Sequence, residues 1–248
     1  MIAPDRVTVV VPTYNEIGSL EDAALGVISQ GYRLLVVDDG SPDGTGRLAD
    51  ELAGDHELID VLHRQEKQGL GPAYIAGFDA ALAAGAEIVC EMDADLSHDP
   101  AVIPVLVAAV EAGADLAIAS RLVPGGGFAN WSMRRRTLSR WGNRYARRML
   151  AVPTRDMTSG FRAFRASGLP RLDPGSCLAN GYAFQIEMAW RAHRAGMTVT
   201  EVPFTFVERT HGRSKLSGRI TFEAIWLVTR WGLRRMLRRG VGGARRRS

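Results

Sequence analysis

The sequence predicts an α/β protein whose central sheet is mostly parallel and covered by helices. Short apolar runs alternate with amphipathic stretches over roughly the first half of the chain, which is the pattern of successive β–α–β units. Several of these runs end abruptly in acidic residues, as buried strands of a parallel sheet do where they meet their loops. A length of 248 residues, of which 46% are hydrophobic, suits one large domain with a substantial core.

The elements expected in the first half follow one another in strict alternation. Each strand is a run of aliphatic residues, and each helix carries apolar residues at helical spacing. The strands are expected at Val7–Val11, Leu34–Asp38, Leu58–His63, Ile88–Met92 and Leu116–Ser120, and the helices at Ile17–Gln30, Thr45–Ala53, Pro72–Ala84 and Ala101–Glu111.

The second half is less regular and ends in two amphipathic helices. Short strands are expected at Phe161–Phe164, Val199–Val202 and Thr205–Val207, with a helix at Ala183–Ala195. The two amphipathic helices, at Asn130–Leu150 and Ile220–Leu237, carry apolar and aromatic residues on one side and arginines on another. The apolar stripes are Leu138, Trp141, Tyr145 and Met149 in the first helix, and Phe222, Trp226, Leu233 and Leu237 in the second.

The positive charge of the chain is concentrated in the first of these helices and in the C-terminal segment that includes the end of the second. The net charge is only +4, yet seven arginines and no acidic residue lie between residues 130 and 149, and eight arginines and no acidic residue follow from residue 230 onward. Such blocks indicate an anionic partner: nucleic acid, a phosphate ligand or a membrane surface. No uncharged apolar run approaches the roughly 18 residues that a membrane span requires.

Two carboxylates stand at the end of a predicted strand. Asp93 and Asp95, separated by Ala94, follow the fourth strand directly. Ligands of open α/β sheets bind beyond the carboxyl ends of the strands, where paired carboxylates suit Mg²⁺ or Mn²⁺. The same triplet also occurs in loops that merely precede a helix. A second acidic strand end, Asp38 followed by Asp39, favours the metal interpretation, although one of that pair is expected to serve only the turn.

Taken together, the motifs resemble family 2 glycosyltransferases of the GT-A fold, a Rossmann-like fold with a mostly parallel central sheet. The first three motifs are the strand ends at residues 9–16, 36–45 and 93–95. Four later segments make the chain similar to the dolichol-phosphate (polyprenol-phosphate) mannose synthases. These segments are Ala119-Ser120-Arg121, Asp156 to Arg162, Gln185-Ile186-Glu187-Met188, and Arg209 to Ser217.

The resemblance implies a set of site residues. It makes Asp95 and Arg121 catalytic, assigns the metal to Asp93, Asp95 and Gln185, and assigns the acceptor phosphate to Arg121, Arg135 and Ser139. The loop that contains Arg209 and Lys215 is expected to close over the donor diphosphate. The donor-binding residues are expected to be Pro12, Tyr14, Glu16, Val37, Asp39, Asp93, Ala94, Asp95, Arg121, Arg209 and Lys215.

The implied reaction is an inverting transfer of mannose from GDP-mannose to a polyprenyl phosphate, with Mg²⁺ or Mn²⁺ as cofactor. A phosphate monoester has a second pKa of about 6 and is already a nucleophile at neutral pH, so no protein base is required. The segment from Gln185 to Glu187 lacks the carboxylate pair that sugar-acceptor relatives use. Two alternatives remain open: glucosyl transfer from UDP-glucose, and an arginine-rich nucleic-acid-binding protein, which would leave the acidic strand ends unexplained.

The expected organisation is a GT-A catalytic domain over residues 1–219 and an amphipathic, basic extension over residues 220–248. The helices around Trp141 and Trp231 are expected to bind an anionic membrane surface peripherally, at its cytoplasmic face, because the acceptor lipid stays in the bilayer. The alternative is that the last helix packs on the catalytic domain or on an integral membrane partner. No nucleic-acid partner is expected.

Overall fold

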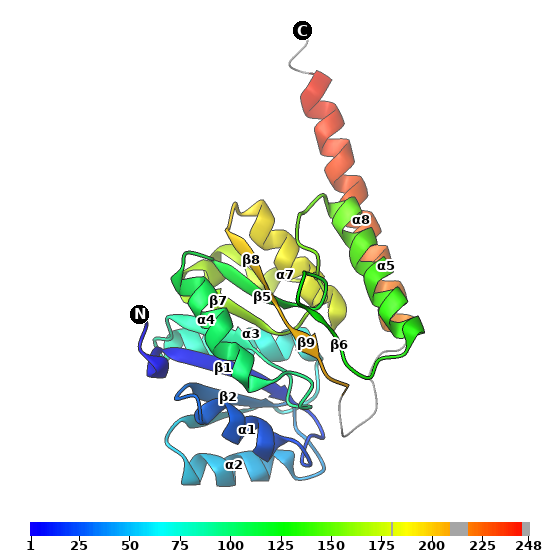
Figure 1. Ribbon diagram of the computed structural model, residues 1–248. Helices are drawn as coiled ribbons and strands as arrows, with labels where there is room; N and C mark the ends of the chain where they lie inside the picture. Colours follow the sequence, from blue (N-terminus) through cyan, green and yellow to red (C-terminus); the bar gives the residue numbers. More distant parts are fainter. Residues whose placement is uncertain (180, 209–217, 245–248) are drawn as a thin grey trace.

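The computed structural model describes residues 1–179, 181–208 and 218–244, and its main sheet has seven strands (Figure 1). The spatial order of the strands is β3-β2-β1-β4-β7-β5-β8, and β7 is antiparallel to both of its neighbours while the other pairs are parallel. The bounds are β1 Val7–Thr13, β2 Arg33–Asp38, β3 Ile59–His63, β4 Ile88–Glu91, β5 Leu116–Ser120, β7 Arg162–Arg165 and β8 Val199–Pro203. The predicted α/β architecture with a mostly parallel sheet is confirmed.

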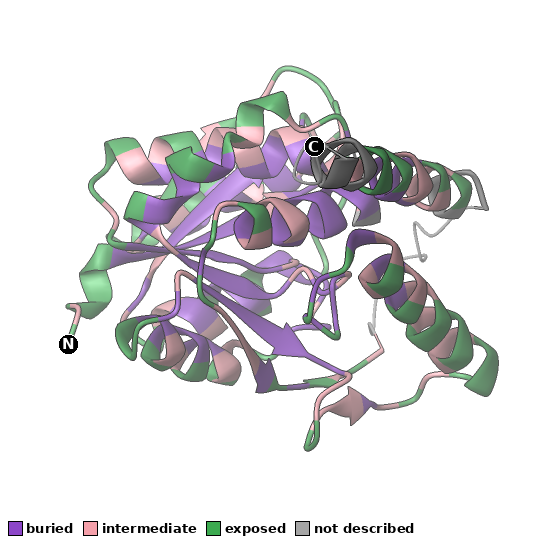
Figure 2. Cartoon of the chain, turned by 90° about the horizontal axis from the view of Figure 1, so that it is seen from above, coloured by how far each residue is buried: buried purple, intermediate pink, exposed green. Residues whose placement is uncertain are grey.

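Helices cover both faces of this sheet, and a second, two-stranded parallel sheet pairs β6 (Gly127–Phe128) with β9 (Thr205–Phe206). Two buried clusters occupy the two faces, one with side chains of α1, α2 and α4 and the other with side chains of α3, α5, α7 and α8. Figure 2 shows the buried strands between the outer, more exposed helices. The helices are α1 Leu20–Ile28, α2 Thr45–Asp55, α3 Leu70–Ala83, α4 Ile103–Glu111, α5 Met133–Leu150, α6 Leu169–Leu172, α7 Tyr182–Arg194 and α8 Gly218–Ala244.

Two predicted helix starts were wrong, in both cases because the chain turns first. Asn15 has a φ of 60°, and the turn after it delays α1 to Leu20. Asn130 has a φ of 58°, and Ser132 is extended and caps α5, which therefore begins at Met133. A positive φ is incompatible with continuation of a right-handed helix, and it is tolerated by asparagine better than by most residues.

The strand directions bring distant segments to one edge of the sheet. Thr13, at the end of β1, lies opposite Asp38, at the end of β2. β4 is parallel to β1, so the acidic triplet that follows Glu91 emerges at the same edge. Because β7 is antiparallel to β4, it starts at Arg162 opposite Glu91, and the loop before β7 also reaches this edge. One edge thus collects the three acidic or polar strand ends and the segment 156–161.

Helices α5 and α8 lie side by side on one flank of the molecule (Figure 1). Tyr145 of α5 and Thr229 of α8 form a hydroxyl–hydroxyl hydrogen bond of 2.5 Å. Trp231 of α8 is buried, with its ring stacked on Trp190 of α7 at a centroid distance of 5.3 Å. The inner side of α8 therefore packs on the catalytic domain, and its expected contact with a membrane stays a prediction for its outer side. No helix among the described residues has both the length and the apolar character needed to cross a bilayer.

Candidate functional site

The carboxylates that follow β4 are held in place by their own loop and by α3. Asp93 Oδ1 accepts a hydrogen bond from the hydroxyl of Tyr74 at 3.3 Å, and Asp95 Oδ1 accepts from the backbone N–H of Ser97 at 3.1 Å. Burial and the neighbouring Asp93 raise the pKa of Tyr74 well above its usual value, so this hydroxyl stays protonated and donates. Both aspartates are thereby oriented before any ligand arrives.

Gly160 creates open space between Asp93 and α7. A Cβ atom at Gly160 would lie 3.6 Å from Nε2 of Gln185 and 3.9 Å from Oδ1 of Asp93, so both side chains border the same small space. Gln185 is buried, and its amide lies beside the buried carboxylate of Glu91. Two carboxylates and an amide oxygen are the hard oxygen donors that Mg²⁺ and Mn²⁺ prefer, so the residues fit a divalent ion. In the described part of the chain, no cluster of three or more His, Cys, Asp or Glu side chains has metal-binding geometry.

Arg162 is fully buried next to this space, and it hydrogen-bonds the backbone segments on both sides of it. Its guanidinium donates to the backbone carbonyls of Ser159 at 2.8 Å, Gln185 at 2.9 Å and Met157 at 2.9 Å. The carboxylate of Glu91 lies 4.0 Å away and is equally buried. Burial raises the pKa of Glu91 to about 7, against the opposing effect of the Arg162 charge. One side chain thus links β4, the loop before β7 and the first turn of α7.

Arg121, at the end of β5, is oriented by a buried carboxylate that the sequence left unassigned. Its Nε and Nη2 donate to Oδ2 and Oδ1 of Asp156, each at 2.7 Å, and its backbone N–H donates to Oδ2 at 3.0 Å. Burial alone would raise the pKa of Asp156, but the charge and hydrogen bonds of Arg121 outweigh burial and hold that pKa below its usual range. A two-pronged pair of this kind defines the plane of the guanidinium.

A hydrogen-bond network connects Arg121 to α5. Arg121 Nη2 also donates to Oγ1 of Thr158 at 2.8 Å, and Asn143 of α5 donates to the same oxygen at 3.0 Å. The amide oxygen of Asn143 accepts from the backbone N–H of Met157 at 2.8 Å. Asn143 is buried, so this contact holds α5 against the loop that carries Asp156.

A small polar cavity, here called the chamber, is lined both by a predicted metal ligand and by residues predicted to bind the acceptor phosphate. The chamber has a volume of about 40 Å³, and Asp93, Arg121 and Arg135 all line it. His98 also lines it, although sequence reasoning missed this residue. The Nδ1 atom of His98 accepts the backbone N–H of Asp93 at 3.0 Å, and its ring stacks on Phe161 with the centroids 4.9 Å apart. The only sequence feature that could have indicated His98 is its position five residues after Asp93. The contact between them forms because the loop folds back on itself.

The two predicted acceptor residues on α5 occupy neighbouring turns. Arg135 forms an ion pair with Glu208, and its guanidinium lies 4.5 Å from the centroid of the Trp131 ring. Ser139 follows one turn later, half-buried, and its carbonyl accepts from Asn143 at 3.0 Å. The predicted Arg209 and Lys215 lie outside the described residues.

At the ends of β1 and β2, the two neighbouring aspartates have different environments. Asp38 accepts from the backbone N–H of Ser41 at 3.1 Å, which is turn chemistry, and from Thr13 Oγ1 at 3.2 Å, which joins it to the end of β1. Asp39 pairs instead with Arg64, which sequence reasoning did not single out. Burial raises the pKa of Asp39 in spite of that pair. Asp38 thus serves the turn and also joins β1 to β2, whereas Asp39 is paired with a side chain from the segment after β3.

The other residues predicted to bind the donor differ in accessibility. Pro12, Tyr14 and Glu16 are half-buried at the end of β1, and Lys67 Nζ lies 3.8 Å from the centroid of the Tyr14 ring. Val37 is fully buried, and its Cγ2 would lie 3.1 Å from a Cβ atom at Gly77 of α3, so its side chain belongs to the core in this conformation. Ala94 is likewise buried in the core beside Asp93.

The comparisons with known proteins identify the family of this chain. The model of the glycosyl transferase family 2 matches residues 8–172, and the chain belongs to this family. It is 48% identical to a polyprenol monophosphomannose synthase of Mycolicibacterium smegmatis, over 97% of this chain and 92% of that protein. It is also 48% identical to an undecaprenyl-phosphate mannosyltransferase of Micrococcus luteus, over 92% of this chain and 94% of that protein.

Solved structures agree with the predicted fold. The glucosyl-3-phosphoglycerate synthase of Mycobacterium tuberculosis, solved with Mn²⁺, UDP-glucose and phosphoglyceric acid, superposes with a TM-score of 0.67. The match covers 91% of this chain and 79% of that one at 22% identity, so it supports the fold alone. The family and the GT-A-type fold expected from the motifs are confirmed.

Proposed function

We propose that this protein transfers mannose from GDP-mannose to the phosphate of a polyprenyl phosphate, with inversion at the anomeric carbon. The observation that carries the proposal is the chamber in which Asp93 meets Arg121 and Arg135, because it unites an oxygen-rich donor side with a cationic acceptor side. The 48% identity to two proteins named for polyprenyl-phosphate mannosyl transfer supports the same substrate class.

On the donor side, Asp93, Asp95 and Gln185 would hold Mg²⁺ or Mn²⁺. A bound divalent ion supplies a Lewis acid for the negative charge that builds up on the departing diphosphate. The hydrogen bonds from Tyr74 and from the Ser97 backbone orient the two carboxylates toward that role. Arg209 and Lys215, by resemblance, would contact the diphosphate from the loop outside the described residues.

On the acceptor side, Arg121, Arg135 and Ser139 would position the lipid phosphate. A dianionic phosphate attacks without a protein base, but it must approach a second anion, and fixed guanidinium groups lower the cost of that approach. Arg121 is already oriented by Asp156, whereas Arg135 would exchange its partner Glu208 for the phosphate. Positioning by fixed charge is therefore the main contribution of these residues.

The nucleotide would bind beside the ends of β1 and β2, against Pro12, Tyr14 and Glu16, near Val37 and Asp39. Because Arg64 pairs with Asp39, a base that donates to this carboxylate would share or displace Arg64. Val37 would contribute through its backbone, since its side chain packs against α3. Calorimetry with GDP and UDP tests this part: clear preference for GDP is expected, and equal or tighter binding of UDP would favour the glucosyl alternative.

Association with a membrane surface would occur through the outer sides of α5 and α8. Leu138 and Trp141 of α5 and Phe222, Trp226 and Leu233 of α8 are between 49% and 71% exposed. Arg230 lies 5.3 Å from the ring of Trp226, which combines a cation with an amphipathic ring as interfacial helices do. An integral membrane partner that covers the same residues is the competing interpretation.

The membrane part is tested by substitution rather than by truncation. Removal of α8 would also remove the buried Trp231 and disturb α7, so the double variant Phe222→Ser/Trp226→Ser is cleaner. It should sediment less with anionic vesicles while GDP affinity is unchanged. The control is Leu25→Ser/Val105→Ser, two partly exposed apolar residues on the other side of the sheet. Equal binding by both variants would contradict direct lipid contact.

The transfer itself is tested with radiolabelled GDP-mannose, UDP-glucose and a polyprenyl phosphate acceptor. Label should enter lipid from GDP-mannose, and a chelator should abolish transfer. Asp95→Asn should nearly abolish transfer without changing the melting temperature by more than a few degrees, whereas Asp60→Asn, at an exposed position of β3, should be neutral. Full activity of Asp95→Asn, or full activity in excess chelator, would contradict the metal assignment. Duplex DNA serves as the control for the nucleic-acid alternative, and no binding is expected.

A further inference from the structure

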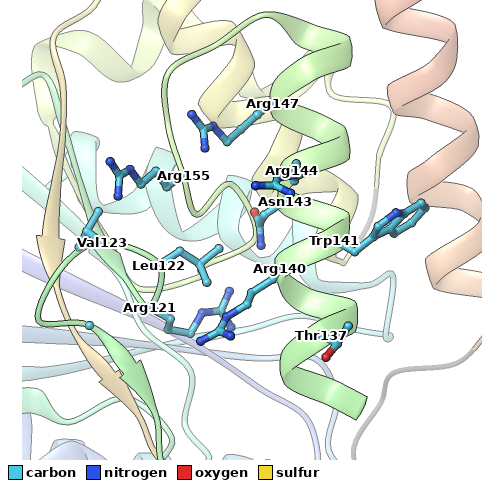
Figure 3. A pocket seen from close by; sticks show the side chains of 11 residues that line it. Arg121, Leu122, Val123, Thr137, Arg140, Trp141, Asn143, Arg144, Arg147 and Arg155 are labelled. Atoms are coloured by element: carbon cyan, nitrogen blue, oxygen red, sulfur yellow. The ribbon is translucent and has the colours of Figure 1, made fainter. Parts of the chain in front are cut away.

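A second cationic cavity lies next to the chamber, between α5 and the segment that follows β5 (Figure 3). We call it the arginine pocket and define it by Arg140, Arg144 and Arg147 of α5 and by Arg155 on the opposite wall. Its volume is about 710 Å³, within the range of roughly 300–1,000 Å³ typical of ligand pockets. Arg121 lines both the arginine pocket and the chamber, so the two cavities adjoin.

The charge of this pocket is not neutralised by the protein. None of the four defining arginines forms an ion pair within the described residues, and no acidic side chain lines the cavity. Glu201 accepts the backbone N–H of Arg155, but it does not line the cavity. Figure 3 shows the side chains of Arg140, Arg144 and Arg147 directed from α5 toward the cavity, which Trp141 of the same helix also lines. Several guanidinium groups that converge without carboxylates repel one another unless an anion is bound.

A second observation also points to a ligand. The Nε of Arg147 is buried and has no hydrogen-bond partner among the described residues. A buried donor without a partner costs free energy that a ligand oxygen would recover. Arg144 and Arg147 lie one helical turn apart, so both guanidinium groups can contact one tetrahedral anion.

We propose that the arginine pocket binds a phosphate group that is distinct from the donor diphosphate and from the acceptor phosphate. Guanidinium groups contact phosphate oxygens in two-pronged pairs, and four of them in a cavity of this size accommodate a phosphate together with its substituent. The phosphate is carried either by the headgroup of an anionic lipid or by a free phosphate compound. The first source is reachable because the outer side of the same helix exposes Leu138 and Trp141.

The first experiment is calorimetric titration of inorganic phosphate into the full chain. A chelator is present so that no divalent ion binds phosphate at the metal site. Wild type should bind phosphate, and Arg144→Gln/Arg147→Gln should weaken binding about tenfold or more, because each lost contact to a charged group is worth a factor of this order. The matched control is Arg134→Gln/Arg148→Gln, which removes the same charge from exposed positions of α5 outside the cavity and should bind as wild type does.

A third variant separates this site from the acceptor site of the proposed function. Arg135→Gln should leave phosphate binding to the arginine pocket intact, since Arg135 lines the chamber and not the pocket. If Arg135→Gln removes the phosphate titration while Arg144→Gln/Arg147→Gln preserves it, the phosphate binds at the acceptor position and the proposal is wrong. GDP affinity, measured in the same variants, should be unchanged in all of them.

The second experiment distinguishes the two phosphate sources. Vesicles of phosphatidylcholine with and without phosphatidylglycerol are sedimented with each variant. If the source is a lipid headgroup, Arg144→Gln/Arg147→Gln should lose more binding to the anionic vesicles than the control does. If the source is a free phosphate compound, vesicle binding should be equal in both variants while the phosphate titration still separates them. Indistinguishable behaviour of the two variants in both experiments would overturn the proposal.

Discussion

Two sets of arginines in this molecule differ in whether the protein itself supplies partners for their charge. Arg121 and Arg162 are buried, and each donates several hydrogen bonds to oxygens of the protein itself. The arginines that define the arginine pocket stand on α5 and its opposite wall without an ion pair among the described residues. A buried charge must be matched by protein groups because desolvation costs several kcal/mol, whereas a charge at the edge of a cavity can stay available for a ligand.

Arginines that are paired with protein groups position the site, whereas arginines without such partners are available to bind a ligand. Arg162 binds no ligand in this scheme, and it holds the walls of the site through three carbonyls. Arg121 is intermediate, since Asp156 orients it while it lines both cavities. Arg140, Arg144 and Arg147 of α5 form no ion pair among the described residues, so their removal should change ligand binding and leave the fold intact.

The largest effect is expected at Arg162. Arg162→Met should destabilise the fold by about 3–5 kcal/mol, because it leaves the buried Glu91 without its counter-charge and three backbone carbonyls without their donor. Urea denaturation monitored by circular dichroism measures this change. A loss below about 1 kcal/mol, the level of an exposed pair, would contradict the assignment of Arg162 as the residue that holds the site together.

A smaller loss is expected at Asp156. Asp156→Asn keeps one acceptor for Arg121 but removes the charge, and it should lower kcat/KM for the lipid phosphate by about 10- to 100-fold, as loss of a charge-assisted hydrogen bond does. GDP affinity should stay unchanged. The control is Asp79→Asn, an exposed carboxylate on α3. An equal effect on GDP binding would show that Asp156 supports the whole site rather than Arg121.

The same carboxyl group should affect the pH dependence of stability. Arg121 holds the pKa of Asp156 below its usual value, so the native state binds this proton less tightly than the unfolded chain does. The contribution of Asp156 is therefore fully present above the ordinary pKa of about 4 and is lost as the pH falls through the lower native value. Melting temperatures between pH 6 and the acid limit of folding should decline less steeply in Asp156→Asn than in wild type. Parallel profiles would contradict this linkage.

The smallest effect is expected for an exposed arginine. Arg33 pairs with Asp60 at 2.7 Å on the outer strands, with both side chains at least one-third exposed. Arg33→Gln should change the free energy of unfolding by less than about 1 kcal/mol, because solvent screens such pairs. The measurement is the same urea denaturation, and a loss comparable to that of Arg162→Met would remove the contrast between buried and exposed arginines.

Much of the fold was predictable because it is encoded locally. Alternation of apolar runs and helical spacing located β1 to β5 and the four helices between them. The acidic ends of two strands indicated a site at one edge of a parallel sheet. The antiparallel direction of β7 was not predictable, because a four-residue strand carries no information about its neighbours.

The sequence by itself determined the family, the α/β class and the strand ends at which the site forms. Only the tertiary structure decided which partner each charged group takes. Asp39 with Arg64, Arg121 with Asp156 and Arg135 with Glu208 are pairs of this kind. The tertiary structure also decided that Trp231 faces inward and stacks on Trp190. The physical reason is that periodicity reports which residues are buried, whereas the choice of partner depends on distances between segments that only chain closure establishes.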